Sequence, residues 1–225
     1  MQRFASVAIL FMHASLAAAG DGWRRVSFEC EQPSRGCDES NCCRRGVLVE
    51  AREVESSAIH QLRATGDIDA SPADVFAVIT AFEKQKGVAH IEEVRILHRD
   101  DREVIFWSMM NPPLLSRRDW VLRARLEPLL PGGTMRVTWE QYDAPDAPAP
   151  RPGVIRLRVN SGGWVIEPLG NGSRTHARYE MSIDPGGLVP AWAANRVMQS
   201  EMPPAFKAAR RDAEQRAHAS VGSKR

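Results

Sequence analysis

The second half of the chain alternates apolar and polar residues in one short segment after another, and this pattern constrains the fold more than any other feature. Such alternation is typical of strands that bury one face. It occurs in Val94–His98, Val104–Met110, Trp120–Leu126, Met135–Tyr142, Val154–Val159, Trp164–Pro168 and Thr175–Ile183. Turn sequences separate these segments, and the prolines between Ala144 and Pro152 indicate an extended surface loop. The pattern predicts a large antiparallel sheet.

Helical patterns stand on both sides of this region. Ser71 and Pro72 are the residue types of an N-cap and a first helical turn, so a helix is expected from there to about Gly87. A long second helix is expected from Pro190 to about Arg216, with an interruption at Pro203-Pro204 because proline breaks the helical hydrogen bonds. Three further strands are expected near the N-terminus, at Trp23–Phe28, Val47–Val54 and His60–Ile68.

A sheet with one apolar face has to bury that face, and the two helices are the segments that can cover it. The expected fold class is therefore α+β, a curved antiparallel sheet wrapped around the long C-terminal helix. Such an arrangement tends to enclose an internal cavity. We expect this domain to cover residues 46–216, and residues 217–225 to form a disordered tail.

The N-terminus has the pattern of an export signal. Residues 1–19 contain a basic start, an apolar run from Phe4 to Leu16 and a small-residue end at Ala17–Ala19. An uncleaved anchor is the alternative, but the run is shorter than the roughly 20 residues that span a bilayer. We therefore expect a signal peptide and an exported, periplasmic or extracellular protein.

All four cysteines lie in one short stretch within residues 20–45, which we interpret as an N-terminal strand followed by a Cys-rich loop. In an oxidising compartment they would form two disulfides, with the pairing left open. The four are Cys30, Cys37, Cys42 and Cys43. A zinc site is the alternative, although the spacing lacks the Cys-x-x-Cys unit that presents two thiolates to one metal.

Charge and motifs exclude several classes of function. The chain has 30 Lys and Arg against 28 Asp and Glu, a formal net charge of +2, which argues against a nucleic acid as the main partner. The 6 histidines are scattered, and no Gly-x-Ser-x-Gly, His-Glu-x-x-His or P-loop sequence occurs. We therefore expect no enzyme, no metal and no cofactor.

Strand alternation selects the side chains that face the interior. The face of Arg118, Trp120 and Leu122 is apolar apart from the arginine, and the long helix adds apolar residues on its inner side. Indole rings and thioethers suit an irregular apolar ligand, but the same residues could fill a packed core. The candidate ligand-binding residues are Trp107, Arg118, Trp120, Leu122, Val137, Trp139, Trp192, Met198, Met202 and Phe206.

Two of these assignments carry open alternatives. Phe106 makes the facing of its strand ambiguous, because the inner face could be that of Trp107 or that of Phe106. Arg118 needs an acceptor on an apolar face. That acceptor could be a ligand headgroup at the pocket mouth, or a structural partner such as Asp184 or a backbone carbonyl.

The same region resembles the START domain family. Asn111 to Val121 is similar to that family's proline loop followed by an Arg-Asp-aromatic-Val motif. The segments Gly163–Pro168 and Asp184–Asn195 resemble its closing strand pair and the start of its last helix, and Ile68–Val75 its first long helix. The resemblance departs from the family at Lys86–Ala89, where an aromatic residue is usual, and in the missing N-terminal helix.

The resemblance implies a helix-grip fold that binds, and often transfers, a single lipid in an internal tunnel. The expected function is therefore binding of one lipid or hydrophobic small molecule, with transient membrane contact, by a monomer that binds no nucleic acid. The alternatives are a cyclase- or aromatase-like enzyme on the same fold and an interaction module with a filled core. We further expect the loop Asn111–Ser116 and the last helix to form a movable gate.

Overall fold

The computed structural model describes residues 22–31, 45–55, 57–88 and 90–222. Within these residues the chain forms one ten-stranded sheet with two α-helices and two short 3-10 helices, η1 and η2. The elements are β1 (Arg24–Cys30), β2 (Gly46–Val54), β3 (Ser57–Ile68), α1 (Pro72–Ile79), η1 (Phe82–Gln85), β4 (Ile91–Arg99), β5 (Glu103–Met110), β6 (Arg117–Glu127), η2 (Pro131–Gly133), β7 (Met135–Gln141), β8 (Val154–Arg156), β9 (Val159–Leu169), β10 (Arg174–Asp184) and α2 (Ala191–Gly222).

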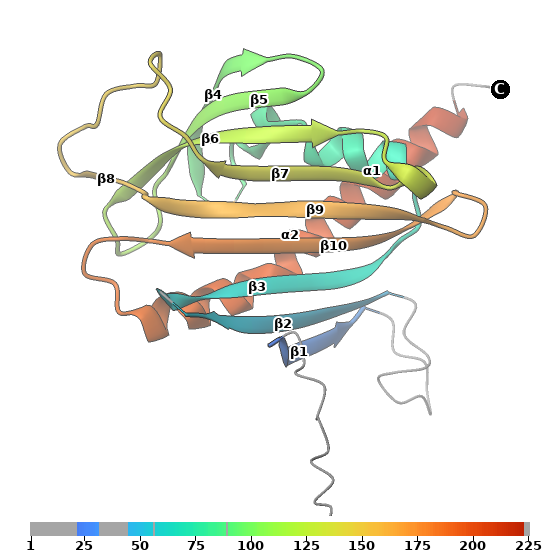
Figure 1. The fold of residues 1–225 in the computed structure, drawn as a ribbon, viewed down its shortest axis with the longest axis horizontal. Helices are drawn as coiled ribbons and strands as arrows, with labels where there is room; N and C mark the ends of the chain where they lie inside the picture. The colour runs from blue at the N-terminus through green and yellow to red at the C-terminus, as the bar shows by residue number, and fades with distance from the viewer. Residues whose placement is uncertain (1–21, 32–44, 56, 89, 223–225) are drawn as a thin grey trace, which may run out of the picture.

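The sheet has the strand order β1-β2-β3-β10-β9-β7-β6-β5-β4, and all neighbours on this path are antiparallel. Both α-helices lie on one side of it, with α2 running behind the strands in Figure 1. α2 packs on β2, β3 and α1. The predicted α+β fold, a large antiparallel sheet closed by a long C-terminal helix, is confirmed. We call the helix-covered side the inner face.

The first helix begins as its sequence predicts and ends earlier. Ser71 has extended backbone angles and its Oγ accepts a hydrogen bond from the backbone N–H of Asp74 at 3.2 Å, which is N-cap geometry. The α-helix stops at Ile79, where the Thr80 hydroxyl bonds the carbonyl of Phe76 at 2.8 Å. η1 follows, so the expected single helix to Gly87 is wrong.

The long helix α2 is continuous for 32 residues through Pro203 and Pro204, so the expected interruption is wrong. Tertiary packing holds the helix at this point, because Met202 and Phe206 on either side of the prolines are fully buried. The helix also includes residues 217–222, which we expected in a disordered tail.

One strand assignment in the proline-rich region is also wrong. Residues 154–159 do not form one strand, because β8 pairs parallel with β6 and the chain then turns into β9. The turn is fixed at Leu157, whose N–H donates to the carbonyl of Asp119 at 2.9 Å and whose side chain is buried. The three residues of β8 therefore pair with the first residues of β6, before the part of β6 that pairs with β7.

Several predictions fall on residues outside the described ranges. These are the signal peptide at residues 1–19 and the cysteines Cys37, Cys42 and Cys43, whereas Cys30 is the last residue of β1. Both the signal peptide and the disulfides stay predictions. Among the described residues, no helix has the length and apolar character needed to cross a membrane.

Candidate functional site

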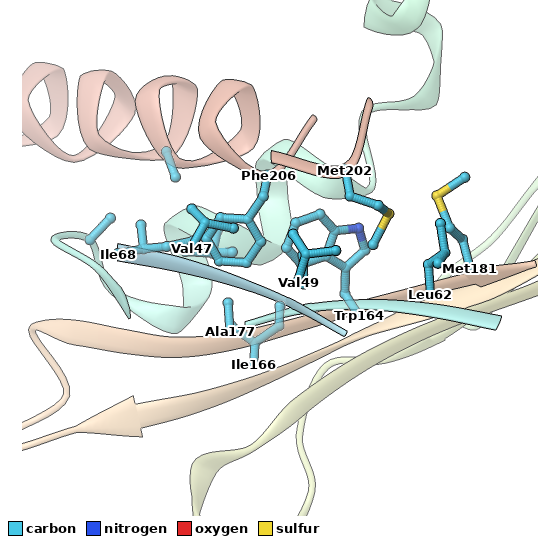
Figure 2. Close-up of a cluster of buried hydrophobic side chains, with 14 of the residues drawn as sticks. Val47, Val49, Leu62, Ile68, Trp164, Ile166, Ala177, Met181, Met202 and Phe206 are labelled. Atoms are coloured by element: carbon cyan, nitrogen blue, oxygen red, sulfur yellow. The ribbon is translucent and has the colours of Figure 1, made fainter. Parts of the chain in front are cut away.

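The inner face carries one apolar cluster beneath α2. Val47 and Leu62 from the strands pack with Met202 and Phe206 from the helix, as Figure 2 shows. The Trp164 ring lies between them, with its centroid 5.5 Å from the Phe206 ring and 4.5 Å from the stacked Tyr179 ring. This cluster fastens α2 to β2, β3, β9 and β10.

A second apolar cluster covers the inner face of β5, β6 and β7. Trp120, Leu122 and Val137 are buried there with Leu157. η1 covers this cluster on the inner side of the sheet, where the Phe82 ring stacks on the Phe106 ring with centroids 4.4 Å apart. The first cluster lies under α2 and α1, whose Val75 belongs to it, and the second lies under η1.

The clusters meet at side chains that keep some accessible surface. Phe76, Ile79, Trp139 and Ile183 pack against both clusters, and each is only partly buried. Tyr179 lies so deep that burial raises its pKa to about 12, yet its side chain also retains accessible surface. Aromatic and aliphatic side chains therefore keep some accessible surface where the two clusters meet.

Most of the predicted site residues face this interior. Each belongs to or packs against one of the two clusters, as strand and helix periodicity predicts, and their role in ligand binding stays a prediction. These residues are Trp120, Leu122, Val137, Trp139, Met198, Met202 and Phe206.

Two predicted site residues lie elsewhere. Trp107 is on the outer face, because Phe106 is the residue of β5 that points inward. Trp192, in the first turn of α2, is 73% exposed, so its expected position on the inner side is wrong. The helix turns that residue toward solvent while Ala194 and Asn195 face the protein.

The outer face at Trp107 is a third buried cluster, which the sequence analysis missed. Asp119 accepts hydrogen bonds from Trp107 Nε1 at 3.0 Å and from Arg156 Nε and Nη2 at 2.7 and 2.8 Å. The proline-rich segment covers it, since Arg156 also donates to the carbonyl of Pro148. A signal was present in the sequence: Val104 to Trp107 are four apolar residues in a row, which indicates a strand buried on both faces.

Arg118 lies at the end of the inner face and is 4% exposed. Its guanidinium donates to the backbone carbonyls of Ser116 and, at 3.3 Å, Pro185. The acceptors are therefore backbone carbonyls, one of the predicted alternatives, and not Asp184. Burial lowers the pKa of Arg118. The residue joins the β5–β6 loop to the β10–α2 loop.

An open cleft of about 490 Å³ lies at the start of α2. Here β3 extends beyond its pairing with β10, which ends at Leu62. Asn195 takes the place of a strand partner, since its Oδ1 accepts from the N–H of His60 at 2.9 Å and its Nδ2 donates to the carbonyl of Ala58 at 3.0 Å. The cleft is lined by Ala58, His60, Trp192, Asn195, Arg196 and Gln199.

Exposed apolar side chains gather on the loops and the helix turn next to this cleft. Leu114 and Leu115 are on the β5–β6 loop, Leu188 is on the β10–α2 loop, and Trp192 and Val197 are on α2. Leu114 and Leu188 are fully solvent-exposed and Leu114 has a positive φ of 62°. These elements lie together at one end of the sheet (Figure 1).

One group of metal-ligand type exists among the described residues, at the β4–β5 turn. The ligand atoms of His98, Asp100 and Glu103 lie within 4.8 Å of one another. Turn geometry accounts for them, because Asp100 accepts hydrogen bonds from the N–H groups of Arg102 and Glu103. These bonds, together with the hydrogen bond from His98, lower the pKa of Asp100 to about 2. His98 and Asp100 are exposed, Glu103 is partly buried, and the group belongs to neither inner cluster.

Comparison with known proteins agrees with this geometry. The sequence profile of the START domain matches residues 51–219. The chain belongs to the START domain family. An uncharacterized protein of Pseudomonas aeruginosa is 28% identical over 155 residues, which is 67% of this chain and 73% of that protein.

Solved structures share the helix-grip fold with this START domain. Human STARD10 superposes with a TM-score of 0.69 at 20% identity, over 88% of this chain and 75% of that one. A STAR-related lipid transfer protein from Xanthomonas axonopodis gives 0.68 at 23% identity, over 86% and 99%. The Zhui aromatase/cyclase from Streptomyces gives 0.51 at 15% identity, over 72% and 96%. The fold is thus shared by proteins named for lipid transfer and by enzymes.

Proposed function

We propose that this START domain binds a single lipid or other hydrophobic small molecule between the inner face of its sheet and α2, and carries it between membranes. The observation that supports it best is the junction of the two apolar clusters. There Trp139 and Ile183, with Tyr179 beside Trp139, keep accessible surface. An apolar ligand at that place would remove this surface from water, which is favourable.

The enzyme alternative would need groups that move protons at the ligand. Tyr179 is the phenol at the cluster junction, and a pKa of about 12 makes it a poor acid near neutral pH. We therefore propose a binding protein and not an aromatase or cyclase. The measurement that separates them is turnover of a bound ligand: the recovered ligand is expected to be chemically unchanged.

Mass spectrometry of the intact protein tests binding itself. Protein purified from its own host under gentle conditions is expected to carry one lipid per chain. The same protein, stripped of lipid, should take up one fluorescent lipid from vesicles. A chain that is empty after purification and takes up no lipid would contradict the proposal.

We propose that the ligand enters where the β5–β6 loop meets the start of α2. Arg118 joins the two loops there, and Asn195 holds the helix to the open edge of β3. Paired cysteines in Ala58→Cys/Asn195→Cys would fix the helix to the strand at a point where carbonyl and amide are now 3.0 Å apart. The oxidised protein should exchange lipid at least tenfold more slowly than its reduced form; equal rates would exclude this gate.

The exposed leucines near the gate support transient contact with a membrane. Leu114 is on the β5–β6 loop, and Leu129, which is 80% exposed, is on the β6–β7 loop at the opposite end of β6. Leu114→Ser should slow lipid uptake from vesicles severalfold, whereas Leu129→Ser should not. Equal effects would mean that surface hydrophobicity in general, and not this end of the molecule, governs uptake.

The site of action that we propose is outside the cytoplasm. The support is the export pattern of residues 1–19, together with the clustered cysteines. N-terminal sequencing of the protein from its host is expected to start after Ala19. An intact Met1 in the mature protein would contradict it.

A further inference from the structure

Arg210, Arg156 and Arg118 all pack against the sheet, and the first two have carboxylate partners. Arg210 is wholly buried and its Nη1 lies 3.4 Å from Glu31 Oε2. Arg156 forms a two-pronged pair with Asp119. Arg118 is also buried, but no carboxylate among the described residues lies within 4.0 Å of it. The fold therefore compensates the other two charges and leaves this one with backbone carbonyls.

An unpaired buried charge is unfavourable, and a guanidinium stays protonated at neutral pH. Two loop carbonyls satisfy Nε and Nη1 of Arg118 but supply no negative charge. Its Nη2 has no hydrogen-bond partner among the described residues. Arg118 thus keeps the Nη2 donor and its positive charge available for a further, negatively charged group.

A second unsatisfied polar group faces the same way. Ser108 is wholly buried, and its Oγ has no hydrogen-bond partner among the residues that the structure describes. It lies opposite Trp120 on the neighbouring strand, and Arg118 precedes Trp120 by two residues on the same face. Residues in this diagonal relation are close enough to contact one ligand group. A hydroxyl and a guanidinium therefore lie on one face of neighbouring strands, at the end of an otherwise apolar surface.

We propose that the ligand of this interior is an amphiphile with an anionic headgroup, a carboxylate or a phosphate monoester, that pairs with Arg118 and accepts a hydrogen bond from Ser108. Arginine binds both groups through two parallel N–H bonds. The apolar chain would extend from there along the two clusters. This inference rests on the proposed function and specifies its ligand class.

Three probes with the same oleoyl chain test it: oleate, oleoyl lysophosphatidic acid and the neutral glycerol monooleate. Binding is followed by the fluorescence of the interior tryptophans, with each probe kept below its micellar concentration. At least one anionic probe should bind tenfold more tightly than the neutral one, and the tighter of the two identifies carboxylate or phosphate. Equal affinity of the neutral probe would overturn the inference while leaving lipid binding intact; failure of all three would overturn lipid binding itself.

Arg118→Gln should reduce the anionic preference to less than threefold and leave the affinity for glycerol monooleate unchanged. Arg123→Gln is the matched control, because Arg123 is on the same strand but on the outer face, paired with Glu103 at 2.7 Å. It should change neither affinity. An unchanged preference in Arg118→Gln would overturn the inference.

Ser108→Ala covers the case in which Arg118→Gln does not fold. It removes a buried hydroxyl that has no partner, so its thermal midpoint should equal or exceed that of the parent. Its affinity for the preferred anionic probe should fall about threefold. Unchanged affinity, together with a parent preference below threefold, would overturn the inference.

Discussion

The two halves of α2 are attached to the protein in different ways. In the C-terminal half, residues 203–222, Arg210 donates to the carbonyls of Arg45 and Gly46, and Glu214 forms a two-pronged pair with Arg45 at 2.9 Å. In the N-terminal half, residues 191–202, Trp192 and Val197 face solvent and the Asn195 amide provides the polar contact with β3. We call the C-terminal half the anchor, because buried and charged contacts attach it, and the N-terminal half the latch, because the Asn195 amide provides its polar attachment.

This difference indicates how the interior can open without unfolding the sheet. The prolines at 203 and 204 lie at the border of the two halves, and each removes one helical hydrogen bond. The gate proposed above would then open by a swing of the N-terminal half about this border, while the charged contacts hold the other half. If both halves were equally anchored, ligand exchange would require release of the whole helix.

The largest expected effect comes from removing the anchor. Arg210→Ala deletes a wholly buried guanidinium with two carbonyl acceptors and an ion pair, so the free energy of unfolding should fall by about 3 kcal/mol. Arg216→Ala is the control on the same helix, because Arg216 is exposed and pairs with Asp74 at 3.4 Å; its effect should stay below about 0.5 kcal/mol. Urea unfolding measures both, and similar losses would show that the C-terminal half is no anchor.

A smaller effect is expected at the latch. Asn195→Ala removes two hydrogen bonds next to an open cleft, where water can replace them, so we expect a loss of about 1 kcal/mol. Because this loss weakens the closed state alone, lipid exchange should become roughly fivefold faster. Gln199→Ala changes another residue of the same cleft, whose side chain makes no hydrogen bond within the described residues, and it should leave the exchange rate unchanged. A faster rate in both variants would contradict a specific latch.

The anchor and the latch show what the sequence could and could not predict. Periodicity located the strands and the inward side of β6, β7 and α2, because these depend on neighbours two or four residues apart. It failed at Trp107, because residues 104–109 are buried on both faces. A segment far along the chain covers the outer face of this strand. The contacts of Asn195 and Arg210, and the choice of Pro185 as a partner of Arg118, were equally invisible, since each joins residues 67 or more positions apart.

The smallest expected effect concerns pH and separates the two halves chemically. Burial raises the pKa of Glu31, but the hydrogen bond from Arg45 and the charges of Arg210 and Lys207 outweigh it, so the pKa lies below its usual 4.5. A carboxyl with a depressed folded-state pKa stabilises the protein above the unfolded value and loses that contribution as pH falls below about 4.5. Acid should therefore loosen the C-terminal anchor.

Asn195 carries an amide, which does not titrate, so acid should leave the latch intact. Urea unfolding between pH 7 and pH 3 should show Glu31→Gln losing less stability on acidification than the parent, by under about 1 kcal/mol because the Glu31 side chain keeps 25% of its accessible surface. Asn195→Ala should lose as much on acidification as the parent does. If Glu31→Gln has the same acid dependence as the parent, its carboxylate does not contribute to the anchor, and the contrast between the halves would rest on Arg210 and Glu214 alone.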